Sequence, residues 1–147
     1  MRSAAIQAVA NLMLAPILVV AAAVLVKGYA DTGDGFAGGA IAAAAFLLQY
    51  VAHGAGAVRA AFPVRWAEPT AVAGVAVALA VALQASLRGE PLLTHEPAPG
   101  TEPVKLGTLE LITAVAFDVG VFLLVLGAVV AIVDALAGAL DAEETGG

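Results

Sequence analysis

One carboxylate stands where a membrane protein can use it for chemistry. Asp118 lies in Ala116-Phe-Asp-Val-Gly-Val-Phe122, with apolar residues on both sides. An acid in such a run costs roughly 2.5–3.5 kcal/mol to insert, so it faces water or a polar partner. Two roles fit it: a carboxylate that handles protons or cations, or a hydrogen-bonding group that fixes the packing of a neighbouring helix. The sequence offers no basic partner within the bilayer and leaves both roles open.

His53 is a second candidate, near the far end of another apolar segment. A histidine titrates near neutral pH and can pass protons, or it can simply hydrogen-bond a loop at the membrane interface. The other histidine, His95, lies in a polar stretch on the opposite side, so the two cannot ligate one haem. With no cysteine and two histidines, we expect no metal site, no cofactor and no catalytic residue.

The composition identifies the solvent around these residues. Of 147 residues, 62% are hydrophobic and 12% charged, and the mean hydropathy is +1.00. A soluble domain carries roughly 25% charged residues, so this chain cannot cover itself with polar surface and lipid must surround it. The net charge is −6 and basic clusters are lacking, which excludes a nucleic-acid partner.

Four apolar segments predict transmembrane helices at about 6–26, 36–58, 70–87 and 110–136. The first has about 20 residues, enough to cross a ~30 Å hydrocarbon core and too many for the apolar part of a signal peptide. A polar loop is expected at 88–109 and an acidic tail at 137–147. The predicted fold class is an all-α integral membrane protein, one domain over 1–147, with four transmembrane helices in a bundle.

Glycines mark the faces on which helices can approach closely. Four of them lie within seven residues, and Gly35 and Gly39 form a G-x-x-x-G pair on one helix face. On a helical wheel that face continues through Tyr50 to His53. In the last apolar segment a stripe repeats every seven residues, namely Thr113, Gly120, Gly127 and Asp134. It points about 200° away from Asp118, so both faces of this segment are engaged, which hints at contacts with other subunits.

Two stretches together resemble a known family. The run Gly28-Tyr-Ala-Asp-Thr-Gly-Asp-Gly-Phe-Ala-Gly-Gly39 and the run Ala116 to Gly127 are similar to the MrpB family, the B-type subunits of Mrp multisubunit sodium/proton antiporters. That family usually reads Gly-His-x-x-Pro-Gly-Gly-Gly-Phe-x-Gly-Gly and then Phe-Asp-x-Gly-Val. The matching residues are Gly33, Gly35, Phe36, Gly38, Gly39 and Asp118. Tyr29, Thr32 and Asp34 depart from it, and Asp34 adds a carboxylate at the membrane edge.

The resemblance implies a non-catalytic integral membrane subunit of a cation/proton antiporter that is driven by the proton gradient. Its partners would be the other antiporter subunits, the lipid bilayer, sodium ions and protons. The ion-path candidates are then Asp118, His53 and Asp34. The candidates for helix packing and assembly are Gly33, Gly35, Phe36, Gly38, Gly39, Gly120 and Gly127.

The sequence also bears on where the protein lies and on which other functions stay open. The resemblance implies the plasma membrane of a prokaryote. Positive charges divide evenly between the two sides, and Arg2 with the α-amine beside the first segment favours cytoplasmic termini. Two alternatives stay open: the equivalent component of a membrane-bound hydrogenase-type respiratory complex, and a purely structural assembly scaffold.

Overall fold

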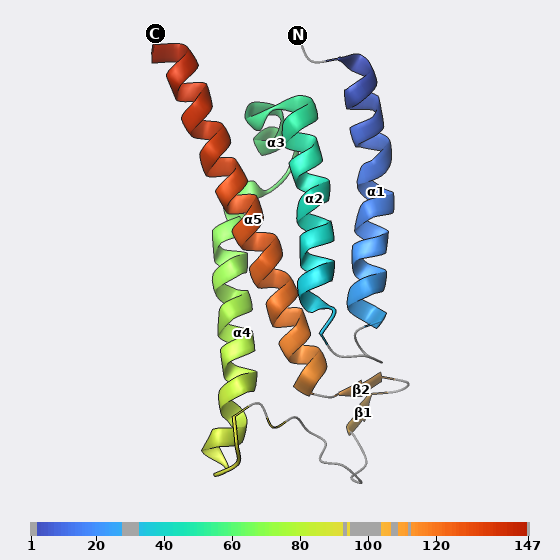
Figure 1. Cartoon of the computed structure of the whole chain (residues 1–147), viewed down its shortest axis with the longest axis vertical. Helices are drawn as coiled ribbons and strands as arrows, with labels where there is room; N and C mark the ends of the chain where they lie inside the picture. The colour runs from blue at the N-terminus through green and yellow to red at the C-terminus, as the bar shows by residue number, and fades with distance from the viewer. Residues whose placement is uncertain are drawn as a thin grey trace.

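Helices dominate the computed structural model, which describes residues 3–27, 33–92, 94, 104–106, 109–111 and 113–146. The elements in chain order are α1 (Ala4–Lys27), α2 (Gly35–His53), α3 (Ala55–Ala61), η1 (Val64–Trp66), α4 (Ala67–Leu87), β1 (Val104–Leu106), β2 (Leu109–Leu111) and α5 (Thr113–Gly146) (Figure 1). Four helical stretches are long and apolar enough to cross a membrane: Ala4–Lys27, Gly35–His53, Val64–Leu87 and Thr113–Leu140. The predicted class of a helical membrane protein with four spans is confirmed.

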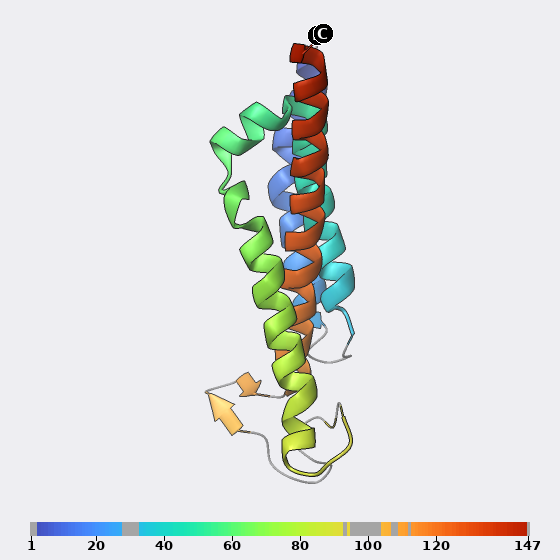
Figure 2. The ribbon, with the colours of Figure 1, turned by 90° about the vertical axis from the view of Figure 1, so that its left-hand side faces the viewer.

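The four spans lie nearly in a row. Helix α4 packs on α5, α5 on α2, and α2 on α1, and the molecule is correspondingly thin when it is turned by 90° (Figures 1 and 2). The start of α1 and the end of α5 lie at one end of the molecule, whereas the start of α2 and the β1–β2 hairpin lie at the other (Figure 1). Half of the α2 span is buried, against 11% of the spans of α1 and α4. The middle of the row is therefore α5 and α2.

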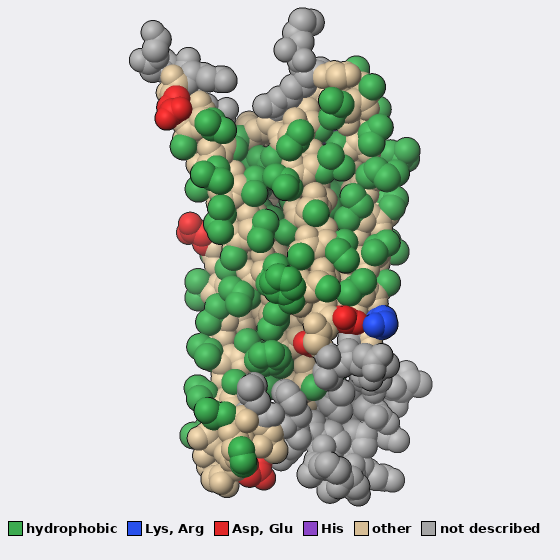
Figure 3. Space-filling model, in the orientation of Figure 1, with side chains coloured by type: hydrophobic (Ala, Val, Ile, Leu, Met, Phe, Trp, Pro, Cys, Tyr) green, Lys and Arg blue, Asp and Glu red, His purple; other side chains and the backbone are tan. Residues whose placement is uncertain are grey.

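Small residues form the interior and large ones face outward. Most of the buried hydrophobic residues are alanines, whereas Leu12 and Leu79 are 69% and 54% exposed. Hydrophobic side chains accordingly cover most of the face shown in Figure 3. Lipid is as apolar as leucine, so helices in a membrane gain little by burying leucine and gain more from close backbone contact through small residues.

The second predicted helix ends earlier than expected. The sequence predicts a helix over 36–58, but α2 ends at His53 and α3 begins at Ala55. Gly54 lies between them with φ of +86°, a left-handed value that glycine adopts without strain. Its N–H still donates to the carbonyl of Tyr50, so the break redirects the chain without leaving that donor unpaired.

The C-terminal segment also differs from expectation. The predicted helix over 110–136 begins instead at Thr113 and continues to Gly146, so most of the predicted tail 137–147 is helical. Three alanines, one leucine and two glutamates make up more than half of 137–146, and these are strong helix formers. The predicted loop over 88–109 overlaps an antiparallel hairpin in which Val104 pairs with Leu111 and Leu106 with Leu109. Arg2, Tyr29, Thr32 and His95 lie outside the described residues.

Candidate functional site

The two stretches that carry the family resemblance meet in the structure. The backbone N–H of Gly33 donates to Oδ2 of Asp118 at 2.9 Å, across 85 positions of sequence. Asp118 lies near the start of α5 and is 5% exposed. Gly33 has φ of +118°, a conformation that other residues adopt only with strain. The glycine thus presents its N–H to the carboxylate, and we call this contact the Gly33–Asp118 clamp.

The helix that follows the clamp lies directly against α5. A Cβ atom at Gly35 would collide with the backbone carbonyl of Asp118, and one at Gly39 would lie 2.8 Å from the carbonyl oxygen of Phe122. A Cβ at Gly38 would lie 3.0 Å from the carbonyl oxygen of Ala21 in α1 and 3.2 Å from the Phe122 ring of α5. Gly38 therefore serves the contact with α1 as well as the contact with α5.

Asp34 and Phe36 do not join the clamp. The Asp34 carboxylate pairs with Nζ of Lys27 at 3.2 Å, and the lysine side chain is 66% exposed. This ion pair connects the end of α1 with the start of α2. Phe36 is 64% exposed, so its side chain lies outside the packing within the chain, although the sequence assigns it to helix packing and assembly.

The opposite face of α5 packs on α4 through backbone. A Cβ at Gly120 would lie 2.8 Å from the amide nitrogen of Ala78, and Gly127 lies against Ala67 and Ala71 in the same way. Gly74 of α4 approaches α5 reciprocally. The chain's own α4 and α2 cover these two faces of α5, so the faces by themselves do not indicate contacts with other subunits.

A second polar contact joins α5 to α2 at the other end of the molecule. Oδ1 of Asp134 accepts hydrogen bonds from the Tyr50 hydroxyl at 2.8 Å and from Nε of Arg59 at 2.7 Å. The Arg59 guanidinium also donates to the Asp134 carbonyl oxygen at 2.9 Å. We call these three residues the Asp134 cluster. The sequence did not predict this cluster, although an up-and-down order of four spans puts Asp134 and Arg59 on the same side.

His53 faces a different helix from Tyr50. Its Nε2 lies 3.0 Å from Oδ1 of Asn11 in α1, and Nε2 of Gln49 donates to the Ala10 carbonyl oxygen at 2.8 Å. The face predicted to run from Gly35 to His53 thus divides between α5 and α1. Asp118 and Asp34 lie near the end of the molecule where α2 and α5 begin, and His53 lies at the opposite end of α2, so the structure does not gather the three ion-path candidates. Within the described ranges, no three histidine, cysteine or acidic residues are placed to hold a metal.

Comparison with known proteins identifies the family. A family described as "Domain related to MnhB subunit of Na+/H+ antiporter" matches residues 5–131. The chain is 34% identical over 110 residues to the B-type subunit of the Na(+)/H(+) antiporter of Bacillus subtilis, covering 75% of this chain and 76% of that protein. It is 33% identical over 106 residues to the corresponding Na(+)/H(+) antiporter protein of Alkalihalophilus pseudofirmus, covering 72% of each.

A longer relative matches as well. The probable K(+)/H(+) antiporter A/B protein of Rhizobium meliloti is 38% identical over 120 residues, which cover 80% of this chain and 12% of that protein. This chain therefore corresponds to a small part of that relative. The family match spans most of the chain, including both Gly33 and Asp118 of the clamp. The chain belongs to the family of domains related to the MnhB subunit of Na+/H+ antiporters.

Proposed function

We propose that this chain is the B-type subunit of a multisubunit antiporter that exchanges a monovalent cation for protons. The names of the relatives support this, since two are components of Na(+)/H(+) antiporters and one is a component of a K(+)/H(+) antiporter. Sodium is the cation we propose, with the other antiporter subunits as partners. These comparisons favour the antiporter over the hydrogenase-type alternative. The proposed location is the plasma membrane, with both termini in the cytoplasm.

The Gly33–Asp118 clamp is the observation that carries our proposal for what this chain does in the complex. The carboxylate is almost fully buried and bonded to a backbone N–H, and a hydrogen bond to a charged group contributes about 1.5–3 kcal/mol. A carboxylate held in this way fixes the turn before α2 and the seat of α2 on α5. In the complex, Gly33, Asp34 and the exposed Phe36 beside them then form a surface on which a neighbouring subunit docks.

The alternative role for Asp118, lining a cation or proton path, makes a different prediction. Asparagine has nearly the shape of aspartate, and its carbonyl oxygen can still accept the Gly33 N–H, but it carries no charge. Asp118→Asn therefore preserves the clamp and removes any ion-handling carboxylate. Asp118→Leu removes both. Comparing Asp118→Asn with Asp118→Leu therefore distinguishes a role of Asp118 in assembly from a role in ion transport.

The experiment uses the whole antiporter complex in everted vesicles from a bacterial strain without other cation/proton antiporters. Cation-induced loss of the pH gradient reports antiport, and a native gel reports assembly. Omitting this chain should abolish both signals, whereas full antiport without it would overturn its assignment to the antiporter. We expect Asp118→Asn to retain assembly and most of the antiport, and Asp118→Leu to lose both. A complex that assembles with Asp118→Asn but has no antiport would make Asp118 an ion-path residue.

A further inference from the structure

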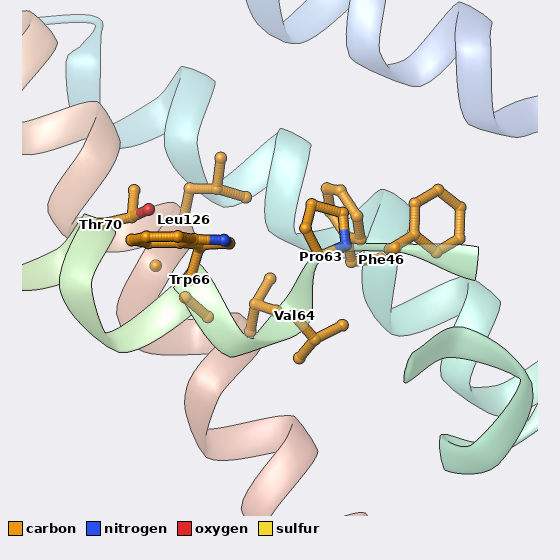
Figure 4. A pocket seen from close by; sticks show the side chains of 10 residues that line it. Phe46, Pro63, Val64, Trp66, Thr70 and Leu126 are labelled. Carbon is orange, nitrogen blue, oxygen red and sulfur yellow. The ribbon is translucent and has the colours of Figure 1, made fainter. Parts of the chain in front are cut away.

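An apolar cavity of about 220 Å³ lies between α2, α4 and α5, beside the α3–η1 turn. Phe46 and Pro63 line one end, and Thr70, Trp66 and Leu126 line the other, with Val64 between them (Figure 4). Trp66 is 55% exposed, so the cavity is not sealed from its surroundings. The turn joins two membrane spans, which places the cavity near the interface between hydrocarbon and water, where tryptophan is enriched.

A polar hollow of about 510 Å³ adjoins this cavity and shares Phe62, Pro63 and Val64 as a wall. Arg59, Arg65 and Asp134 also line it. The carboxylate of Asp134 already pairs with Arg59. The guanidinium of Arg65 lies 5.8 Å from the Trp66 ring centroid and has no ion pair among the described residues.

The charges around Arg65 leave the hollow positive. Arg59 and Asp134 cancel, so the surplus within the hollow is the single charge of Arg65. Glu68 lies with Arg65 along a smaller hollow on the α4 side and forms no ion pair with it in the described part of the chain. A ligand that fits both spaces has an apolar chain for the cavity and a negative group for Arg65.

We propose that an anionic phospholipid binds at this position, with one acyl chain in the apolar cavity and its phosphate at Arg65. Arginine is well suited to phosphate because its planar guanidinium donates two parallel hydrogen bonds. The position also suits a phospholipid, because the apolar cavity and the hollow with Arg65 lie side by side at one end of the membrane spans. This site is independent of the clamp at the opposite end and does not rest on antiport activity.

The chain contains a single tryptophan, Trp66, and it lines the cavity, so its fluorescence reports what lies there. The full chain is placed in vesicles of phosphatidylcholine with brominated acyl chains, which quench tryptophan on contact. Unbrominated phosphatidylglycerol or phosphatidylcholine then replaces part of that lipid. If the site selects anionic lipid, phosphatidylglycerol restores the fluorescence at a membrane fraction about fivefold lower than phosphatidylcholine does.

Variants separate the two halves of the site. Arg65→Gln should remove the preference for phosphatidylglycerol, whereas Arg88→Gln, a matched loss of an exposed arginine on the other side of the membrane, should keep it. Thr70→Phe fills the cavity and should also remove the preference although Arg65 is present. Circular dichroism checks that each variant is folded. Equal recovery by both lipids in the wild type, or an unchanged preference in Arg65→Gln, overturns the proposal.

A protein segment is the competing occupant. Native mass spectrometry of the intact antiporter complex decides between them, because the wild type should retain one more phosphatidylglycerol than Arg65→Gln. Equal lipid numbers in the two complexes would mean that another subunit covers the cavity, and the lipid site would be rejected.

Discussion

The two faces of α5 hold their neighbours by different means. Against α4 the contact is backbone on backbone, at Gly74, Gly120 and Gly127. Against α2 there are glycine contacts as well, but a polar contact secures each end: the Gly33–Asp118 clamp at one and the Asp134 cluster at the other. In lipid, where apolar burial drives little association, close backbone packing holds the first interface, and hydrogen bonds at both ends add to such packing in the second.

This difference has a consequence for substitutions. An interface that depends on shape is damaged by any added volume and is indifferent to charge. One that is secured by hydrogen bonds tolerates a substitution of similar shape if a partner remains for each donor, and it is damaged when a donor is left unpaired. The variants below test this contrast, beginning with the largest expected effect.

Gly120→Leu should have the largest effect. Its side chain would collide with the backbone of Ala78, which cannot move without separating α4 from α5. We expect a loss of about 3 kcal/mol, the upper part of the range for overpacking, and little assembled complex on a native gel. Gly56→Leu is the matched control, because nothing lies within 4 Å of a Cβ there. Normal assembly of Gly120→Leu would show that the α4 interface is loose.

Substitutions in the Asp134 cluster should have an intermediate effect. Asp134→Ala removes the carboxylate that accepts from Tyr50 and from Nε of Arg59. The Arg59 guanidinium keeps its bond to the backbone carbonyl, and the ion pair is partly exposed, so we expect a loss of about 1–2 kcal/mol. Tyr50→Phe removes one hydrogen bond and should cost about 1 kcal/mol. Denaturation of the full chain in detergent, followed by the fluorescence of Trp66, measures both.

The double variant tests whether these residues act together. Because Tyr50 bonds to Asp134 itself, Tyr50→Phe should add almost nothing in a chain that already carries Asp134→Ala. If the two losses simply add, Tyr50 stabilises the chain by another contact and the cluster does not secure this end of α5.

Lys27→Met should have the smallest effect. The Lys27–Asp34 ion pair is largely exposed, and such pairs contribute about 0–1 kcal/mol. The same fluorescence measurement should show almost no change in stability at low or high salt. A loss as large as that of Asp134→Ala would mean that the Lys27–Asp34 ion pair contributes more to seating α2 than an exposed pair can.

The sequence alone could predict the spans and the residues of close helix contact. Apolar length indicates the four spans, and the spacing of Gly35, Gly39, Gly120 and Gly127 indicates where backbones meet. It could not predict which helix each face meets. Gly38 and Gly39 are adjacent, but Gly38 lies against α1 as well as α5, whereas Gly39 lies against α5, and that assignment depends on the order of the helices in the row.

The polar contacts were also beyond a sequence-based prediction. Asp118 and Gly33 both belong to the recognised motifs, but nothing in the spacing says that a backbone N–H is the carboxylate's partner. Asp134, Arg59 and Tyr50 come from three separate elements, and the break at Gly54 sets where Arg59 lies. The break depends on the left-handed backbone conformation of Gly54. A glycine at the end of an apolar run does not by itself predict that conformation.

The central claim is that Asp118 holds the turn before α2 through the Gly33 N–H. Amide hydrogen exchange at Gly33 in the folded chain tests it most directly. The wild type should exchange slowly and Asp118→Ala roughly 10–100-fold faster, as expected for losing a hydrogen bond to a charged group. Asp118→Asn should lie between them, because its neutral amide oxygen accepts a weaker bond from the Gly33 N–H. If Gly33 exchanges at the same rate in the wild type and in Asp118→Ala, the clamp does not exist.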